Sequence, residues 1–147
     1  MRVLIQRVLS ASVRLIKEGK AKEEASIERG LLLFIGIGKN DNPDIADFLL
    51  KKIFYLRIFE DKGKFDLSLK DIKGEVLAVP QFTLYGNTEK GRRPEFTAAE
   101  RPERAKELFD LFCERLGEYV PCKKGFFGEK MEVELVNDGP VTLMVEK

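Results

Sequence analysis

The sequence contains no histidine, and this absence excludes several kinds of chemistry. Neither a Ser–His nor a Cys–His pair can activate a nucleophile, and no imidazole can hold a metal ion. The two cysteines, Cys113 and Cys122, lie nine positions apart, a spacing that fits neither a zinc site nor a disulfide framework. We interpret both as buried or half-buried structural thiols, and we expect neither a metal nor any other cofactor.

The sequence also lacks an excess of one charge and any long apolar run. There are 26 basic against 25 acidic side chains, so binding to RNA would depend on local clusters of Lys and Arg. No apolar run approaches the roughly 20 residues of a membrane span, and the first residues do not have the layout of a signal peptide. These absences predict a cytoplasmic protein without a membrane partner. Asn and Gln are scarce beside Lys and Glu, a bias typical of proteins from hot environments.

The composition that remains is that of a globular protein. Apolar residues make up 44% of the chain and charged residues 35%, and 147 residues suffice for one domain with a buried core. No repeat, linker or low-complexity tract interrupts the chain. We therefore expect residues 1–147 to form a single domain.

Apolar patterning predicts many strands and two main helices. A helix is expected to begin at Pro43, with Asn42 as its cap, and a second to run from Pro102 to a stop near Gly117. Alternating or continuous apolar runs predict strands at residues 3–5, 13–15, 21–28, 30–38, 74–84, 131–136 and 141–145, with fragments between 59 and 69. The first two are expected to be separate strands with a bend near residues 10–11. This pattern favours an α+β fold on a mostly antiparallel sheet or partial β-barrel.

A first candidate for chemistry is the Pro-Gln-Phe-Thr-Leu motif at residues 80–84. Pro80 cannot donate to a sheet ladder, so it marks an edge or a bulge. Such an irregularity can turn the N–H groups of Gln81, Phe82 and Thr83 towards a ligand, and backbone donors aimed at a developing oxyanion are strong catalytic devices. The alternative is an ordinary strand end, which the motif alone favours.

A second candidate is the Asn-Asp-Gly-Pro-Val-Thr motif at residues 137–142. A Gly–Pro bond is one of the few places where a cis peptide costs little. A cis bond between Gly139 and Pro140 would splay the neighbouring carbonyl oxygens in one direction, where they could bind an ammonium group. The alternative is a plain hairpin turn between two strands.

Basic and aromatic residues in expected loops form a third candidate. Lys90, Arg92 and Arg93 lie in a long polar stretch at residues 86–100, and such clusters suit contact with phosphates. Phe127 lies between glycines near Gly128, where an exposed ring could stack on a base. The alternatives are a solvated surface for the cations and a place in the core for the ring.

Five segments, in the same order, resemble the D-aminoacyl-tRNA deacylase family, and together they cover essentially the whole chain. They lie at residues 1–8, 56–61, 81–84, 90–94 and 137–142. One position departs from the family pattern, since Pro80 replaces the Ser that usually precedes Gln-Phe-Thr. We expect the change to be tolerated, because the shape of this loop matters more than that side chain.

The resemblance implies a homodimer with its two active sites at the subunit interface. It implies hydrolysis of the ester between a D-amino acid and the terminal adenosine of tRNA, a chiral proofreading step, and clearance of mischarged glycyl-tRNA(Ala). It also implies that Gly139 and Pro140 are a cis pair that reaches into the partner's site and rejects L-amino acids. Arg7 would orient this pair, and Asn137 belongs to the same motif.

The resemblance further implies that Gln81, Phe82 and Thr83 line the pocket, and that Phe127 and Gly128 lie near the terminal adenine. Thr83 is a poor nucleophile without a base beside it, and no carboxylate is expected in the pocket motifs. Catalysis is therefore expected to use backbone groups and the 2′-hydroxyl of the tRNA. Two alternatives stay open, a nucleic-acid-binding module that has lost hydrolysis and a purely structural interaction protein. DNA is not expected as a partner.

Overall fold

The long N-terminal strand organises the fold. In the computed structural model, which describes residues 1–147, strand β1 (Arg2–Lys17) pairs antiparallel with β3 (Gly30–Gly36), with β2 (Lys20–Ile27) and, along its other edge, with β8 (Met131–Glu146). Residues 3–5 and 13–15, which were predicted to be separate strands, both belong to β1. The structure has two register shifts against β8, between Gln6 and Ser10, where two buried residues and then two exposed ones interrupt the alternation of buried side chains.

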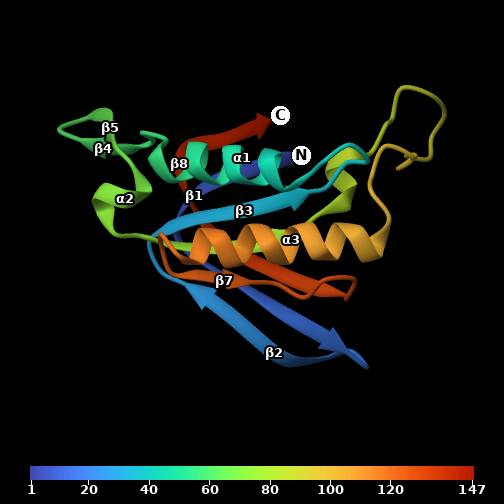
Figure 1. Cartoon of the computed structure of the whole chain (residues 1–147). Coiled ribbons are helices and arrows are strands. Elements are labelled where there is room, and N and C mark those ends of the chain that lie inside the picture. Colours follow the sequence, from blue (N-terminus) through green and yellow to red (C-terminus); the bar gives the residue numbers. More distant parts are fainter.

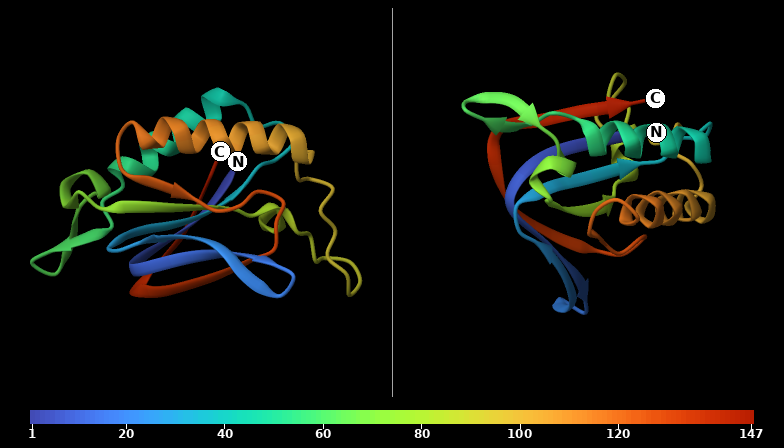
Figure 2. Two further views of the ribbon diagram at one scale, coloured as in Figure 1. Left: turned by 90° about the horizontal axis from the view of Figure 1, so that it is seen from below. Right: turned by 60° about the vertical axis from the view of Figure 1, so that its left-hand side comes forward.

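The sheet continues beyond β3 through two parallel pairs. Strand β6 (Glu75–Pro80) pairs with β3, and β7 (Cys122–Lys124) pairs with β6, which gives the order β2-β1-β3-β6-β7 with β8 on β1. The sheet curls so that β2 also contacts β6 and β7 (Figure 2). The predicted α+β class and partial barrel are confirmed.

Two helices cover one face of this sheet (Figure 1). Helix α1 (Pro43–Tyr55) and helix α3 (Pro102–Gly117) pack on each other, and both begin at the predicted proline. Asn42 caps α1 as expected, because its side-chain oxygen accepts from the Ile45 N–H at 3.0 Å. None of the helices is long and apolar enough to cross a membrane.

The main core lies between the helices and the sheet, and a smaller core lies inside the curl. The main core holds 26 buried residues, among them Phe109 and Phe112 of α3. The smaller core holds seven, including Leu32 and Leu77 from the other face of the sheet. A short helical turn α2 (Leu69–Ile72) follows the hairpin of β4 (Phe59–Asp61) and β5 (Lys64–Leu67), which is the predicted pair of strand fragments.

Two predicted strand boundaries are wrong. Strand β6 ends at Pro80, and a 3₁₀ turn η1 (Phe82–Tyr85) replaces the predicted strand end. Pro80 is not on an edge strand, because β6 lies between β3 and β7; the pairing with β7 stops at Ala78, so Pro80 lies just past it. The predicted hairpin at residues 137–140 is a stretch inside the single strand β8, and both halves of β8 pair with β1.

Candidate active site

A pocket opens at the carboxyl ends of β3 and β6, where α3 begins and the long loop of residues 86–100 joins it. Its volume is about 500 Å³, and it combines apolar walls with a few polar groups, as ligand sites usually do. The lining residues come from five segments: Ile35, Ile37 and Lys39; Pro80, Gln81 and Phe82; Phe96, Thr97, Ala99 and Glu100; Arg101, Pro102 and Ala105; Phe127 and Gly128.

Two free backbone donors lie side by side where β6 gives way to η1. The Gln81 N–H still donates to the Ile35 carbonyl at 2.8 Å, but the Phe82 and Thr83 N–H groups have no acceptor in the chain. The first N–H groups of any helical turn lack internal partners, so this freedom follows from the turn itself. The expectation that Pro80 precedes an irregular backbone with unpaired donors therefore has a structural basis.

Close packing fixes the position of this turn. A Cβ on Gly36 would lie 3.0 Å from the Gln81 carbonyl oxygen and 3.1 Å from the Leu84 Cβ, so only glycine permits β3 to approach so closely. The Gln81 amide donates to the Thr83 hydroxyl, which ties the two side chains together. Thr83 itself does not line the pocket, whereas Gln81 and Phe82 do.

The expected aromatic loop forms part of the pocket wall. Phe127 packs against Phe109 of α3, with 6.1 Å between ring centroids, and also lines the pocket. Gly128 adopts φ = +74°, a backbone conformation that favours glycine. Phe82 stands on the pocket rim, 58% exposed, with its ring edge-on to Phe96.

Sequence reasoning did not find three charged pocket residues. Lys39 and Arg101 supply cations, and Glu100 supplies a carboxylate where none was expected. The Glu100 side chain is 6% exposed, pairs with Arg104 at 3.4 Å and accepts from the Arg101 N–H at 2.8 Å. Both oxygens are therefore engaged in holding the pocket wall. Three loops meet here only in the folded chain, so no local motif could have indicated them.

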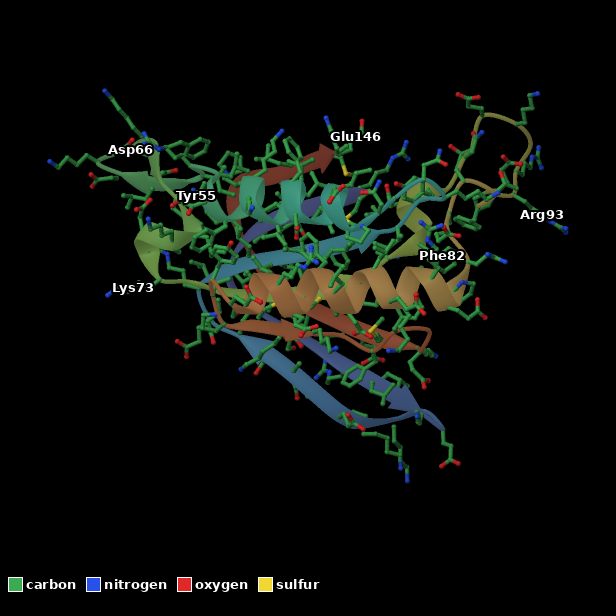
Figure 3. All side chains as sticks on the ribbon, viewed as in Figure 1. Tyr55, Asp66, Lys73, Phe82, Arg93 and Glu146 are labelled. Atoms are coloured by element: carbon green, nitrogen blue, oxygen red, sulfur yellow. The ribbon has the colours of Figure 1, made fainter.

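The predicted basic cluster lies on the loop beside the pocket and not in it. Lys90, Arg92 and Arg93 are all exposed and form no ion pair within the chain. Figure 3 shows Arg93 at the outer end of this loop, with Phe82 nearer the body of the protein. Backbone bonds between Asn87 and Glu95, at 2.8 and 3.0 Å, close the base of the loop.

The Gly139–Pro140 bond is cis, and the Arg7 side chain contacts the carbonyl oxygens beside it. The Arg7 side chain is 3% exposed and donates to the carbonyl oxygens of Ile58 at 2.6 Å, Asp138 at 3.2 Å and Gly139 at 3.5 Å. It also pairs with the Asp138 carboxylate at 3.0 Å. The Asn137 amide donates to the carbonyl oxygens of Arg7 and Val141, which fixes the same stretch from its other side.

Within one chain, this Gly–Pro pair lies far from the pocket. The pair adjoins Arg7 and Val8 of β1, whereas the pocket begins beside Ile35, which pairs with Val3. Five residues along a strand span about 16 Å. The two groups therefore lie towards opposite ends of β3, where Gly30 pairs with Val8 and Ile35 pairs with Val3. In Figure 3, Phe82 marks the pocket end, and Asp66 marks the end where the Phe65 ring lies 5.6 Å from the Arg7 guanidinium.

Comparison with known proteins adds three findings. A family model described as D-Tyr-tRNA(Tyr) deacylase matches residues 4–146. A solved structure named c-Myc DNA Unwinding Element Binding Protein is 38% identical over 100% of this chain and 99% of its own, with a TM-score of 0.90. A structure described as a probable eukaryotic D-amino acid tRNA deacylase shares the fold at 18% identity, over 98% and 97% of the two chains, with a TM-score of 0.83.

Proposed function

The chain belongs to the D-Tyr-tRNA(Tyr) deacylase family and is a hydrolase that acts on D-aminoacyl-tRNA, and from this premise we propose that backbone groups carry its catalysis. The observation that supports this most directly is the pair of unpartnered N–H groups of Phe82 and Thr83 beside the pocket. A hydrolase without histidine needs another source of transition-state stabilisation, and these donors suit a developing oxyanion.

The ester carbonyl oxygen accepts hydrogen bonds from these two N–H groups. As water attacks the carbonyl carbon, negative charge grows on that oxygen, and each donor of this kind contributes roughly 10²–10³ in rate. The Thr83 hydroxyl faces the Gln81 amide and no base, so it is not the nucleophile. The 2′-hydroxyl of the terminal ribose orients the attacking water.

The apolar pocket receives the terminal adenosine. Phe127 offers a ring on which an adenine can stack, and Gly128 leaves room for close approach. Lys39 and Arg101 lie in the same wall, where they neutralise the phosphates next to the terminal nucleotide. Lys90, Arg92 and Arg93 contact the tRNA backbone farther out, because they are exposed and unpaired on the neighbouring loop.

The working site needs a second copy of the chain. Since Gly139 and Pro140 lie about 16 Å along the sheet from their own pocket, they reach a pocket only in a partner. Strand β8 pairs along one edge only, and an apolar row of Met144, Leu4 and Phe34 crosses the sheet beside it. An unpaired edge and exposed apolar side chains are features that a homodimer interface covers.

The Gly–Pro pair rejects L-amino acids by steric blockage. Arg7 fixes the carbonyl oxygens of Asp138 and Gly139, so they form a rigid wall that can also accept from the substrate ammonium group. A D-residue points its side chain away from this wall, whereas the mirror-image residue drives its Cβ into it. Glycine has no side chain to block, so mischarged glycyl-tRNA(Ala) is a substrate as well. We place this proofreading in the cytoplasm, where aminoacyl-tRNA is used.

The decisive experiment compares three substrates with the purified protein: D-Tyr-tRNA, L-Tyr-tRNA and glycyl-tRNA(Ala). We expect the D-ester and the glycyl ester to be cleaved and the L-ester to persist. Equal cleavage of the two tyrosyl esters would contradict the steric wall. An intact glycyl ester would indicate a pocket that recognises the D side chain instead.

A second candidate function is nucleic-acid binding without hydrolysis, which the name of the 38% identical relative favours. A binding module would hold charged and uncharged tRNA equally and release no amino acid. A duplex DNA probe in the same binding assay separates this function from RNA recognition. A purely structural protein would ignore all of these ligands.

A further inference from the structure

The two cysteines, which the sequence presents as unrelated, lie on two elements that pack together in the fold. Helix α3 ends at Gly117, and the chain turns back at once into β7, which packs along α3 (Figure 1). Cys113 is buried on α3 and Cys122 is half-buried on β7, and both are free thiols. Together they line a surface hollow of about 570 Å³, separate from the pocket described above.

The surroundings make the two thiols unequal. A hydrogen bond from Cys113 lowers the pKa of Cys122, and the Lys124 ammonium lowers it further against the opposing effect of burial. The same hydrogen bond, together with burial, raises the pKa of Cys113. Cys122 is therefore the thiol that ionises more readily, and the thiolate is the nucleophilic form of a cysteine.

The charged groups around the hollow do not convert it into a metal site. No three Cys, Asp, Glu or His side chains in the chain are arranged to hold an ion. Among the carboxylates of α3 that line the hollow, Asp110 is already paired with Lys106 at 2.5 Å and with Lys124 at 2.6 Å. Both thiols line the hollow, and the half-buried Cys122 is the one that ionises more readily.

We propose that Cys113 and Cys122 form a hydroperoxide-reactive dithiol site, in which Cys122 attacks the oxidant and Cys113 resolves the product into a disulfide. The Cys122 thiolate attacks one oxygen of hydrogen peroxide, the O–O bond breaks, and the leaving hydroxide takes a proton to give water. The sulfenic acid on Cys122 is then attacked by the Cys113 sulfur. The S–O bond breaks, the Cys113 proton leaves with the hydroxide as a second water, and the S–S bond forms.

This disulfide would join α3 to β7 just before the segment that carries Phe127 and Gly128 into the pocket wall. Strand β7 leads into Phe127, and Phe127 packs on Phe109 of α3, so the bond joins the two elements that hold this ring. Closing the short loop between the two cysteines restricts the unfolded chain. We expect the oxidised protein to melt about 5–10 °C higher than the reduced one.

The test treats the reduced full-length protein with equimolar hydrogen peroxide, then unfolds it, alkylates free thiols and measures the intact mass. The wild type should lose both alkylation sites together, lose the mass of two hydrogens, and recover both thiols on treatment with dithiothreitol. In Cys113→Ser the reaction should stop at a Cys122 sulfenic acid that dimedone traps. In Cys122→Ser the remaining thiol should oxidise at least about tenfold more slowly than the wild type.

Three results would overturn the proposal. One is a Cys122→Ser variant whose Cys113 oxidises as fast as in the wild type. Another is a wild type in which the Cys122 sulfenic acid reacts with dimedone or is oxidised further and no disulfide forms. A third is a disulfide between two chains, seen on a non-reducing gel. Circular dichroism confirms the fold of each variant. Since Cys113 is buried and a serine there could disturb the fold, Cys113→Ala serves as a second variant for the dimedone experiment. The mass measurement on the wild type needs neither variant.

Discussion

Arg7 is a buried cation, and we propose that it also fixes the wall that excludes L-amino acids. Its planar guanidinium donates to three carbonyl oxygens and pairs with Asp138, and a second carboxylate, Glu60, lies 3.6 Å away. A buried cation is tolerated only when its donors are matched in this way. The geometry of the Gly139 and Asp138 carbonyl oxygens therefore depends on one side chain from β1.

The substitution Arg7→Lys should both destabilise the protein and loosen its chiral selection. A lysine keeps the charge but cannot span several acceptors, so we expect a loss of about 2–4 kcal/mol in the free energy of unfolding. The ratio of L-Tyr-tRNA to D-Tyr-tRNA cleavage should rise about tenfold, because the wall is less rigid.

Urea denaturation and parallel deacylation assays measure the two effects. Arg14→Lys is the matched control, since Arg14 lies on the same strand and pairs with Glu134 at 3.1 Å, but is 36% exposed. Arg14→Lys should lower the free energy of unfolding by no more than about 1 kcal/mol. An unchanged chiral ratio in a folded Arg7→Lys protein would remove Arg7 from the specificity mechanism.

Tyr85 gives the protein a specific weakness at high pH. Burial, followed by the nearby Asp41 carboxylate, raises the pKa of Tyr85 to about 12 from an ordinary value of 10.0. A folded-state pKa above the unfolded one means that this stabilisation is complete below pH 10 and is lost as the pH rises towards 12. Tyr85→Phe should therefore lose less stability than the wild type over that interval. Melting temperatures of both proteins from pH 8 to 12 measure it, and parallel curves would contradict this assignment.

At the scale of elements, the turn η1 depends on how closely β3 approaches it. Gly36→Ala would place a methyl group 3.0 Å from the Gln81 carbonyl oxygen and 3.2 Å from the Tyr85 ring, so the turn must shift by some tenths of an ångström. The Phe82 and Thr83 N–H groups would move with it. We expect a fall of about tenfold or more in kcat for D-Tyr-tRNA, because catalysis is sensitive to such displacements.

Gly117→Ala is the control for that substitution. Its Cβ would meet nothing within 4 Å, so the rate should stay unchanged. Single-turnover kinetics with both variants separate the chemical step from substrate binding. A Gly36→Ala variant with the wild-type rate would show that the position of η1 does not matter for catalysis.

The elements differ in how well the sequence predicts them, and the difference follows the range of their contacts. Asn42 and Pro43 mark the start of α1 correctly because a cap acts within a few residues. Residues 137–140 have the composition of a turn, yet they continue β8 because pairing with distant β1 outweighs local preference. Gly139 and Pro140 predict an irregular backbone at this point, but they do not distinguish a turn from an interruption within a strand.

The candidate site shows the same limit. Gln81 and Phe82 were found because their motif is contiguous, and the contact from Arg7 to Gly139 was expected only through the family resemblance, since 132 positions separate the two residues. Lys39, Glu100 and Arg101 were missed because ordinary charged residues carry no signal until loops bring them together. Cys113 and Cys122 are one buried and one half-buried thiol, as the sequence predicted, but their proximity could not be predicted. Their separation in sequence resembles no motif, but the return of β7 along α3 makes them neighbours.

On the scale of the whole molecule, the proposed dimer rests on the sheet face next to β8. Met144 is 47% exposed in the row with Leu4 and Phe34. Met144→Glu would bury a carboxylate in the interface, so the protein should sediment as a monomer of 16.8 kDa and lose its activity. Phe48→Glu is the control, because Phe48 is equally exposed, at 48%, but lies on α1. Sedimentation velocity at micromolar concentration measures both, and a wild type that is monomeric there would contradict the composite site.

The distance of about 16 Å between each Gly–Pro pair and the pocket of its own chain has a consequence for mixtures of subunits. If each pocket takes its Gly–Pro wall from the partner subunit, a subunit with a defective wall and a subunit with a defective pocket can complement each other in a mixed dimer. Subunits carrying Gly36→Ala have a damaged pocket and a sound wall, and subunits carrying Arg7→Lys have the reverse. After random exchange of equal amounts, about half of the sound pockets would be faced by a sound wall. Cleavage of L-Tyr-tRNA should then fall by about half while cleavage of D-Tyr-tRNA stays constant. Chiral fidelity would thus be a property that one subunit confers on its neighbour and cannot exercise for itself.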